Sequence, residues 1–162
     1  IIASGQDQER SSRYGKIMFD ISFIIPVAPK GKARHRTANG RAYTPADQVR
    51  WEQQFALFAA QHRPEQTLTG ALGLYVTAVF SRPKRLRRKK DSENFIYHTS
   101  KPDADNVCKS ICDALNDTGW WRDDSQVAFM SCTKYYEEKE GPGPRLIIRI
   151  VELKDASEET KS

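Results

Sequence analysis

The chain has 162 residues, and its 26 Lys and Arg against 21 Asp and Glu give a formal net charge of +5. This length suits one domain of ordinary size, and no apolar run approaches the roughly 20 residues that a helix needs to span a bilayer. We therefore expect a soluble, cytoplasmic protein without a membrane partner. The basic balance by itself points only weakly to a polyanionic partner.

The elements expected from apolar periodicity define a single domain over residues 17–154. Residues 1–16 are polar and are interpreted as a loose or artificial extension, and residues 155–162 as a polar tail. Within the domain, the pattern predicts a strand at 19–27, a helix from Thr44-Pro45 to about 62 with Thr44 as its N-cap, a strand at 71–80, a helix at about 105–117, and strands at 127–136 and 144–153. The predicted fold is α+β: a small mixed or antiparallel sheet with two packed helices, in the order β-α-β-α-β-β.

Two basic segments lie outside these elements. The first follows the first strand, and the second is the dense run from Arg82 to Lys90. A charge run is most often a solvated loop, but this run leads towards a group of acids, which favours phosphate binding. The predicted DNA-binding residues are Lys30, Lys32, Arg34, Arg36, Arg85, Arg87 and Arg88. Tyr43 could stack on a base or cap the core. At least one of Trp120 and Trp121 is expected to pack in the core, and the other could touch a base exposed at a branch point.

The acids concentrate around the second helix, in Lys101-Pro-Asp-Ala-Asp-Asn and in Asp123-Asp124. Residues two apart lie on opposing sides of a helix but on the same side of an extended segment. Because Pro102 disfavours helical geometry just before it, we expect an extended approach in which Asp103 and Asp105 converge, with Asp105 at or near the N-cap. Asp105, Lys109, Asp113 and Asn116 would then form a polar stripe, and Asp124 would have to return to it from its loop.

Converging carboxylates suit Mg²⁺, which binds one or two of them together with water and substrate phosphate. A metal ion there could activate a water and stabilise phosphate charge, and Lys109 could pair with a phosphate oxygen. Each acid also has a plainer interpretation. An Asp at a helix start is usually a cap, Asp123-Asp124 could be an ordinary turn, and Asp105–Lys109 could be a solvated helix pair. The coincidence of several acids and a Lys beside a basic segment favours the metal site.

The same residues carry a family resemblance. Lys101-Pro-Asp-Ala-Asp-Asn-Val with Lys109, Asp113-Ala-Leu-Asn116 and Asp123-Asp124-Ser-Gln-Val127 resembles the RusA family of Holliday-junction resolvases, common in phages and prophages. Pro29-Lys-Gly-Lys-Ala-Arg-His-Arg and Gly40-Arg-Ala-Tyr-Thr-Pro45 are also similar to that family, and the resemblance runs from about residue 19 to 153. The chain departs from the short bacterial members by a longer loop between the basic run and Asp103.

The resemblance implies a homodimeric, Mg²⁺-dependent endodeoxyribonuclease that binds four-way DNA junctions and nicks opposed strands during recombination or repair, with Mn²⁺ as a possible substitute. It implies that Asp103, Asp105 and Asp124 bind the metal and that Lys109 assists them in catalysis, while Asp113, Asp123 and Asn106 are lesser candidates. Two alternatives stay open: a non-catalytic nucleic-acid-binding module, and a metal nuclease for other branched or single-stranded DNA.

Overall fold

A five-stranded mixed sheet forms the body of the protein in a computed structural model that describes residues 15–155. The predictions for residues 1–14 and 156–162 lie outside the described residues. The sheet order is β1 (Lys16–Ile25), β7 (Arg145–Lys154), β4 (Ala71–Phe80), β6 (Val127–Tyr136) and β5 (Ile96–Tyr97). Only the β4–β6 pair is parallel within this sheet. The predicted α+β class with a mixed sheet is confirmed, and the longer elements follow the predicted order.

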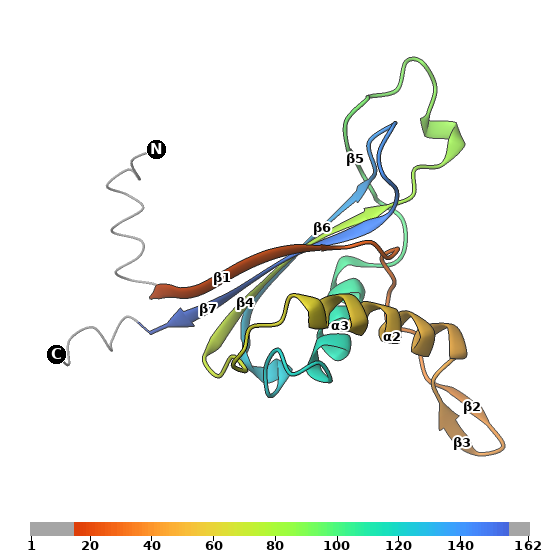
Figure 1. Ribbon diagram of the computed structural model, residues 1–162. Helices are drawn as coiled ribbons and strands as arrows, with labels where there is room; N and C mark the ends of the chain where they lie inside the picture. Colours follow the sequence, from red (N-terminus) through yellow and green to blue (C-terminus); the bar gives the residue numbers. More distant parts are fainter. Residues whose placement is uncertain (1–14, 156–162) are drawn as a thin grey trace, which may run out of the picture.

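Two helices, α2 (Ala46–Gln61) and α3 (Ala104–Asn116), cover one face of the sheet (Figure 1). Parallel strands need a crossover connection, and the chain supplies one by passing from β4 through α3 to β6. Phe55 of α2, Leu74 of β4 and Ile111 of α3 are completely buried in the core between these layers. The segment that leaves β4 therefore ends at the N-terminus of α3, which is packed against the sheet. None of the helices within residues 15–155 is long and apolar enough to cross a membrane.

The first basic segment contains a hairpin that the sequence analysis missed. Strands β2 (Arg36–Ala38) and β3 (Arg41–Tyr43) pair antiparallel around Asn39-Gly40. Both turn residues have positive φ, 51° and 74°, as a type I′ turn requires, and Asn-Gly is the preferred pair for it. The Asn-Gly pair in the sequence therefore indicated the turn, but strands of three residues are too short to show the alternation that identifies a strand.

The start of α2 differs from the prediction. Pro45, and not Thr44, is the N-cap: its backbone is extended, and its carbonyl accepts hydrogen bonds from Gln48 N (3.0 Å) and Val49 N (3.2 Å). No side chain caps this end. Proline serves there because the N-cap residue contributes its carbonyl to the helix and needs no N–H of its own.

Trp120 and Trp121 are both core residues, so the expectation that one of them might meet an exposed base is wrong. Their exposed fractions are 0% and 2%. The Trp120 ring donates its N–H to Ala59 O (3.0 Å), and Trp121 donates to Asn116 Oδ1 (2.6 Å). The polar end of each indole is thus satisfied inside the protein, and Asn116 is engaged in packing at the end of α3.

Candidate functional site

The segment before α3 is extended, as predicted. Asp103 has φ −68° and ψ 150°, and it follows a cis peptide bond between Lys101 and Pro102. The helix begins one residue earlier than expected, so Asp103 occupies the N-cap and Asp105 lies in the first turn. Asp105 therefore lies near the N-cap, as expected, and Asp103 is the N-cap itself. Asp103 makes no side-chain cap hydrogen bond, which leaves its carboxylate free for another partner.

The four residues to which the resemblance assigned catalysis share one property. Asp103, Asp105, Lys109 and Asp124 are all exposed, and none of the four side chains forms an ion pair with another residue in 15–155. Asp105 and Lys109 stand one turn apart but do not pair, which removes the interpretation of a simple helix ion pair. Three carboxylates and an ammonium group are therefore available to a ligand.

A short helical turn, η2 (Asp124–Gln126), presents Asp124 to solvent. Asp123 caps this turn by accepting a hydrogen bond from Ser125 N on Oδ1 (2.8 Å). Hydrogen bonds from the Ser125 side chain and then from its backbone N–H hold the pKa of Asp123 below its usual range. Gln126 completes the capping box and donates from Nε2 to Leu68 O and Gly70 O, both at 3.1 Å. Asp123 and Gln126 thus build the loop that holds Asp124. The sequence analysis gave Gln126 no role, although it lies in the quoted motif.

Two buried cysteines of α3, Cys108 and Cys112, lie close to acidic side chains of the site. Burial raises the pKa of the Cys112 thiol to about 11, and the negative charges of Asp124 and Asp113 add to the shift. The pKa of Cys108 is also raised, chiefly by a hydrogen bond with Cys132 and by burial, with a smaller contribution from Asp105. The turn η2 contacts α3, so the loop after α3 returns to the helix, as the sequence analysis required. All three cysteines are free thiols.

The donor types fit Mg²⁺, because exposed carboxylates with no internal cation are the ligands that this metal prefers. Among residues 15–155, however, no three His, Cys, Asp or Glu side chains lie close enough together to bind a metal ion. The structure therefore brings Asp105 and Asp124 to the same helix but does not assemble Asp103, Asp105 and Asp124 into a closed metal site.

The lesser candidates on α3 hold the first basic segment in place. Asp113 pairs with Lys32 at 2.7 Å, and Lys32 also reaches Glu52 of α2 at 3.2 Å. Asn106 and Lys32 are joined twice, by Asn106 Nδ2 to Lys32 O and by Lys32 N to Asn106 O, both at 3.3 Å. Gly31 packs directly against Asn106 and Pro102, because a Cβ at Gly31 would lie 2.7 Å from each. The segment is thereby held against the start of α3.

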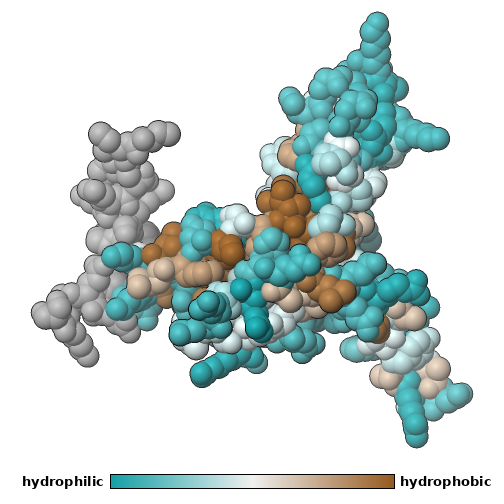
Figure 2. All heavy atoms as spheres, in the orientation of Figure 1, coloured by the Kyte–Doolittle hydropathy of each residue, from teal (hydrophilic) through white to brown (hydrophobic). Residues whose placement is uncertain are grey.

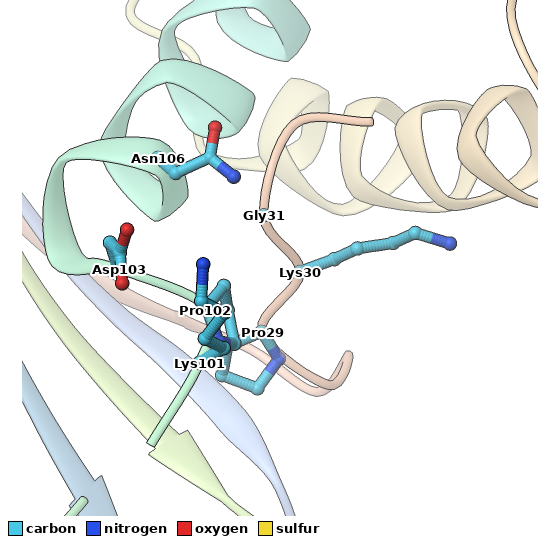
Figure 3. A pocket seen from close by; sticks show the side chains of 7 residues that line it. All are labelled: Pro29, Lys30, Gly31, Lys101, Pro102, Asp103 and Asn106. Carbon is cyan, nitrogen blue, oxygen red and sulfur yellow. The ribbon is translucent and has the colours of Figure 1, made fainter. Parts of the chain in front are cut away.

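These contacts leave a pocket of about 450 Å³ between the first basic segment and the start of α3, lined by Pro29, Lys30, Gly31, Lys101, Pro102, Asp103 and Asn106. Figure 3 shows Asp103 and Asn106 at the helix start, with Lys101 beside Pro102. Lys30 turns away from Asp103 towards α2 (Figure 3), where it pairs with Asp47 at 2.6 Å. The sequence prediction did not include Lys101 as a site residue, although it immediately precedes the acidic motif.

The second basic segment is folded around a buried cation. Arg82 is only 3% exposed and donates to the carbonyls of Ser92 (2.6 Å), Leu86 (2.8 Å) and Asn94 (3.2 Å). A short turn, η1 (Lys84–Leu86), begins the loop. Arg82 is thus not part of a solvated charge run, because its guanidinium group satisfies several loop carbonyls at once.

The predicted DNA-binding residues of this loop differ in their partners. Arg87 bonds to Glu137 Oε1 at 2.7 Å and to the carbonyls of Arg82 and Lys139. Arg88 forms an ion pair with Asp91. Arg85 is exposed and forms no ion pair in the described part of the chain. Of these three arginines, Arg85 is therefore the one most available to bind a DNA phosphate.

The two basic segments form separate projections from the body. The β2–β3 hairpin extends beyond α2, and the loop around η1 extends past the end of the sheet (Figure 1). Figure 2 shows the projection around η1 as largely hydrophilic and the hairpin as a mixture of hydrophilic and intermediate residues, with a recess between the two. Arg34 and Arg36, at the base of the hairpin, are exposed. The chain leads from one projection through Lys32 to the pocket, and from the other through Lys101 to Asp103.

Comparison with known proteins identifies the family of this chain. Residues 25–151 match the family model of endodeoxyribonuclease RusA. The chain therefore belongs to the RusA family of endodeoxyribonucleases. It is similar to an uncharacterised protein, YqaN, of Bacillus subtilis (strain 168), with 35% identity over 135 residues, which is 79% of this chain and 91% of that protein.

Proposed function

We propose that this protein is a metal-dependent endodeoxyribonuclease that binds four-way DNA junctions and nicks opposed strands. One observation carries the proposal. The residues at the four catalytic positions of the family motif are exposed and form no ion pair within residues 15–155, whereas their motif neighbours Asn106, Asp113 and Asp123 are engaged in intramolecular bonds. The neighbouring residues are thus held by bonds within the protein, while these four groups face the solvent.

Asp103, Asp105 and Asp124 would hold Mg²⁺, or Mn²⁺ in its place, together with phosphate oxygens of the substrate, since one or two carboxylates plus phosphate suffice for this ion. The bound ion would supply Lewis acidity and a more acidic water at neutral pH. Lys109 has no internal partner and would pair with a phosphate oxygen, stabilising charge that develops during cleavage.

The remaining cations differ in how freely each could bind the DNA backbone. Arg34, Arg36 and Arg85 are exposed and have no ion-pair partner within residues 15–155, so they are the strongest candidates. Lys30 would exchange its exposed partner Asp47 for phosphate. Arg88 would have to leave Asp91, whose side chain is only 12% exposed. Lys32 and Arg87 are more deeply engaged, and DNA contacts by them would require breaking bonds to Asp113 and Glu137.

Paired nicking of one junction needs two active sites, so the proposal includes a homodimer. An exposed apolar surface supports it. The sheet face opposite the helices carries Ile24, Tyr75 and Phe129, which are 54%, 36% and 47% exposed. Tyr75 and Phe129 contact each other across β4 and β6, with ring centroids 5.1 Å apart. Apolar clusters of this kind often mark interaction surfaces. Light scattering with junction present should give the mass of two chains, and a strictly monomeric mass would argue against paired cutting.

The catalytic assignment is tested with a labelled mobile four-way junction, with and without Mg²⁺, against linear duplex. Asp105→Asn should bind the junction as the wild type does but lower the cleavage rate by about 100-fold or more. Asp117→Asn is the matched control, because Asp117 is an exposed acid just beyond the other end of α3. Wild-type cleavage by Asp105→Asn would remove Asp105 from the site.

The absence of a three-donor cluster within residues 15–155 favours a second candidate, a non-catalytic junction-binding module. Such a protein would leave the junction intact at every Mg²⁺ concentration. Cleavage of flaps or single strands but not of four-way junctions would instead assign a different branched substrate.

A further inference from the structure

The β2–β3 hairpin concentrates particular side chains on one face. Arg36 pairs with Tyr43, and Ala38 pairs with Arg41. Directly paired residues of an antiparallel ladder share a face, and residues two apart on a strand do so as well. Arg36, Arg41 and Tyr43 therefore lie on the same face of the ribbon. Thr37 and Ala42 occupy the other face.

The charge of this face is not neutralised by the protein. Residues 29–46 contain five Lys and Arg and no Asp or Glu. Lys30 and Lys32 are compensated by α2 and α3, whereas Arg36 and Arg41 form no ion pair with any residue in 15–155. Tyr43 is 46% exposed, and neither guanidinium group is stacked on its ring. Two cations and one aromatic ring thus face solvent together.

The hairpin contributes no buried side chain to the hydrophobic core. Every residue from Arg36 to Tyr43 is exposed, and the ribbon projects beyond α2 (Figure 1). An isolated two-stranded hairpin is marginally stable in water, yet here it is shaped by an Asn-Gly turn and anchored at its base by Lys32. An exposed cationic and aromatic ribbon of this kind matches a polyanion with accessible π-faces, which is nucleic acid with unstacked bases.

We propose that the β2–β3 hairpin is a DNA-contacting ribbon in which Arg36 and Arg41 bind phosphates and Tyr43 stacks on a base unstacked at the branch point. This inference rests on the proposed function, because only branched DNA offers such a base beside intact duplex arms. The hairpin is thereby a specificity element, separate from the carboxylates of α3.

The test is fluorescence anisotropy in EDTA, with a labelled four-way junction and a linear duplex over a range of salt. Replacing Arg36 and Arg41 together by Ala should weaken binding to both DNAs and make the slope of log affinity against log salt shallower by about 1.8, since each lost phosphate contact accounts for about 0.9. Lys16→Ala is the control, because Lys16 is an exposed cation at the far end of β1 (Figure 1). An unchanged slope in the double variant overturns the inference.

Tyr43→Ala should weaken junction binding roughly 5- to 150-fold, the range of one base–aromatic stack, and leave linear duplex binding unchanged. Tyr43→Phe should bind as the wild type does, because it keeps the ring. Equal weakening on both DNAs overturns the stacking assignment.

Replacing Gly40 by Ala gives an independent check. The Ala side chain opposes the positive φ of 74° at this position but meets no atom within 4 Å. Junction binding should therefore fall, while the melting temperature of the protein stays the same.

The outcomes separate this inference from the nuclease proposal, because binding is measured without metal. A wild-type protein that binds junctions through the hairpin and never cleaves them with Mg²⁺ refutes the nuclease proposal and supports the ribbon. A wild-type protein that cleaves junctions, with Arg36 and Arg41 dispensable for affinity and slope, refutes the ribbon and supports the nuclease.

Discussion

Replacing Lys32 by Met distinguishes an internal tether from a DNA contact. The Lys32 ammonium group lies 2.7 Å from Asp113 and 3.2 Å from Glu52, and the exposed fractions of the three side chains are 27%, 41% and 28%. Exposed ion pairs contribute about 0.2–1 kcal/mol, and breaking a buried pair costs about 3–5 kcal/mol. This half-buried group falls between them, so we expect a loss of about 2 kcal/mol in the free energy of unfolding. That loss corresponds to roughly 4–8 °C in melting temperature.

Chemical denaturation measures this loss, with Lys30→Met as the matched control. Lys30 is the same residue type two positions away, but its partner Asp47 is 69% exposed, so its loss should cost less than about 1 kcal/mol. A double-mutant cycle with Asp113→Asn should show a coupling energy of about 1 kcal/mol. In DNA binding, the salt slope of Lys32→Met should equal that of the wild type, because no phosphate contact is removed.

The pH dependence of the same variant follows from the Lys32 pKa. Desolvation alone would lower it, but the hydrogen bonds and charges of Asp113 and Glu52 outweigh that effect and raise the pKa above 10.5. A raised pKa of a cation contributes stability that is fully present below the unfolded value and is lost as pH rises through the folded value. The difference between wild type and Lys32→Met should therefore shrink above about pH 10.5. Unchanged stability together with a salt slope shallower by about 0.9 would refute the tether and make Lys32 a DNA contact.

Two further predictions concern the loop around η1 and the edge of the sheet. Arg82→Ala should leave loop carbonyls without donors, cost about 2–4 kcal/mol, and make the segment around Lys84 cleavable by trypsin under native conditions; unchanged digestion would contradict the organising role of Arg82. The Arg149 guanidinium bonds Asp20 at 2.8 and 2.9 Å and holds the Asp20 pKa below 3.8. A lowered carboxylate pKa contributes stability above the unfolded value that is lost as pH falls, so Asp20→Asn should be less stable than wild type at pH 7 but equal to it well below pH 3.8. A difference that persists in acid would assign the effect to packing.

Some features of this protein are local, and the sequence by itself determined them. Strands β4 and β6 coincide with the predicted ranges 71–80 and 127–136, because runs rich in apolar, aromatic and β-branched residues favour strands. The extended approach to α3 follows from Pro102, since proline restricts itself and the residue before it whatever surrounds them. The four exposed motif residues were identified by type and spacing, which depend only on the chain.

Only the tertiary structure decided which charged side chains form bonds within the protein and which stay exposed. Nothing in the spacing distinguishes Asp113, which pairs with Lys32, from Asp105, which stays free. Nor does it separate Asp123, a cap, from its neighbour Asp124. Arg82 and Arg85 belong to one charge run, yet the first is buried and the second is exposed. An ion pair depends on distances of a few ångströms between segments far apart in the chain, and these distances are set by how the helices pack on the sheet.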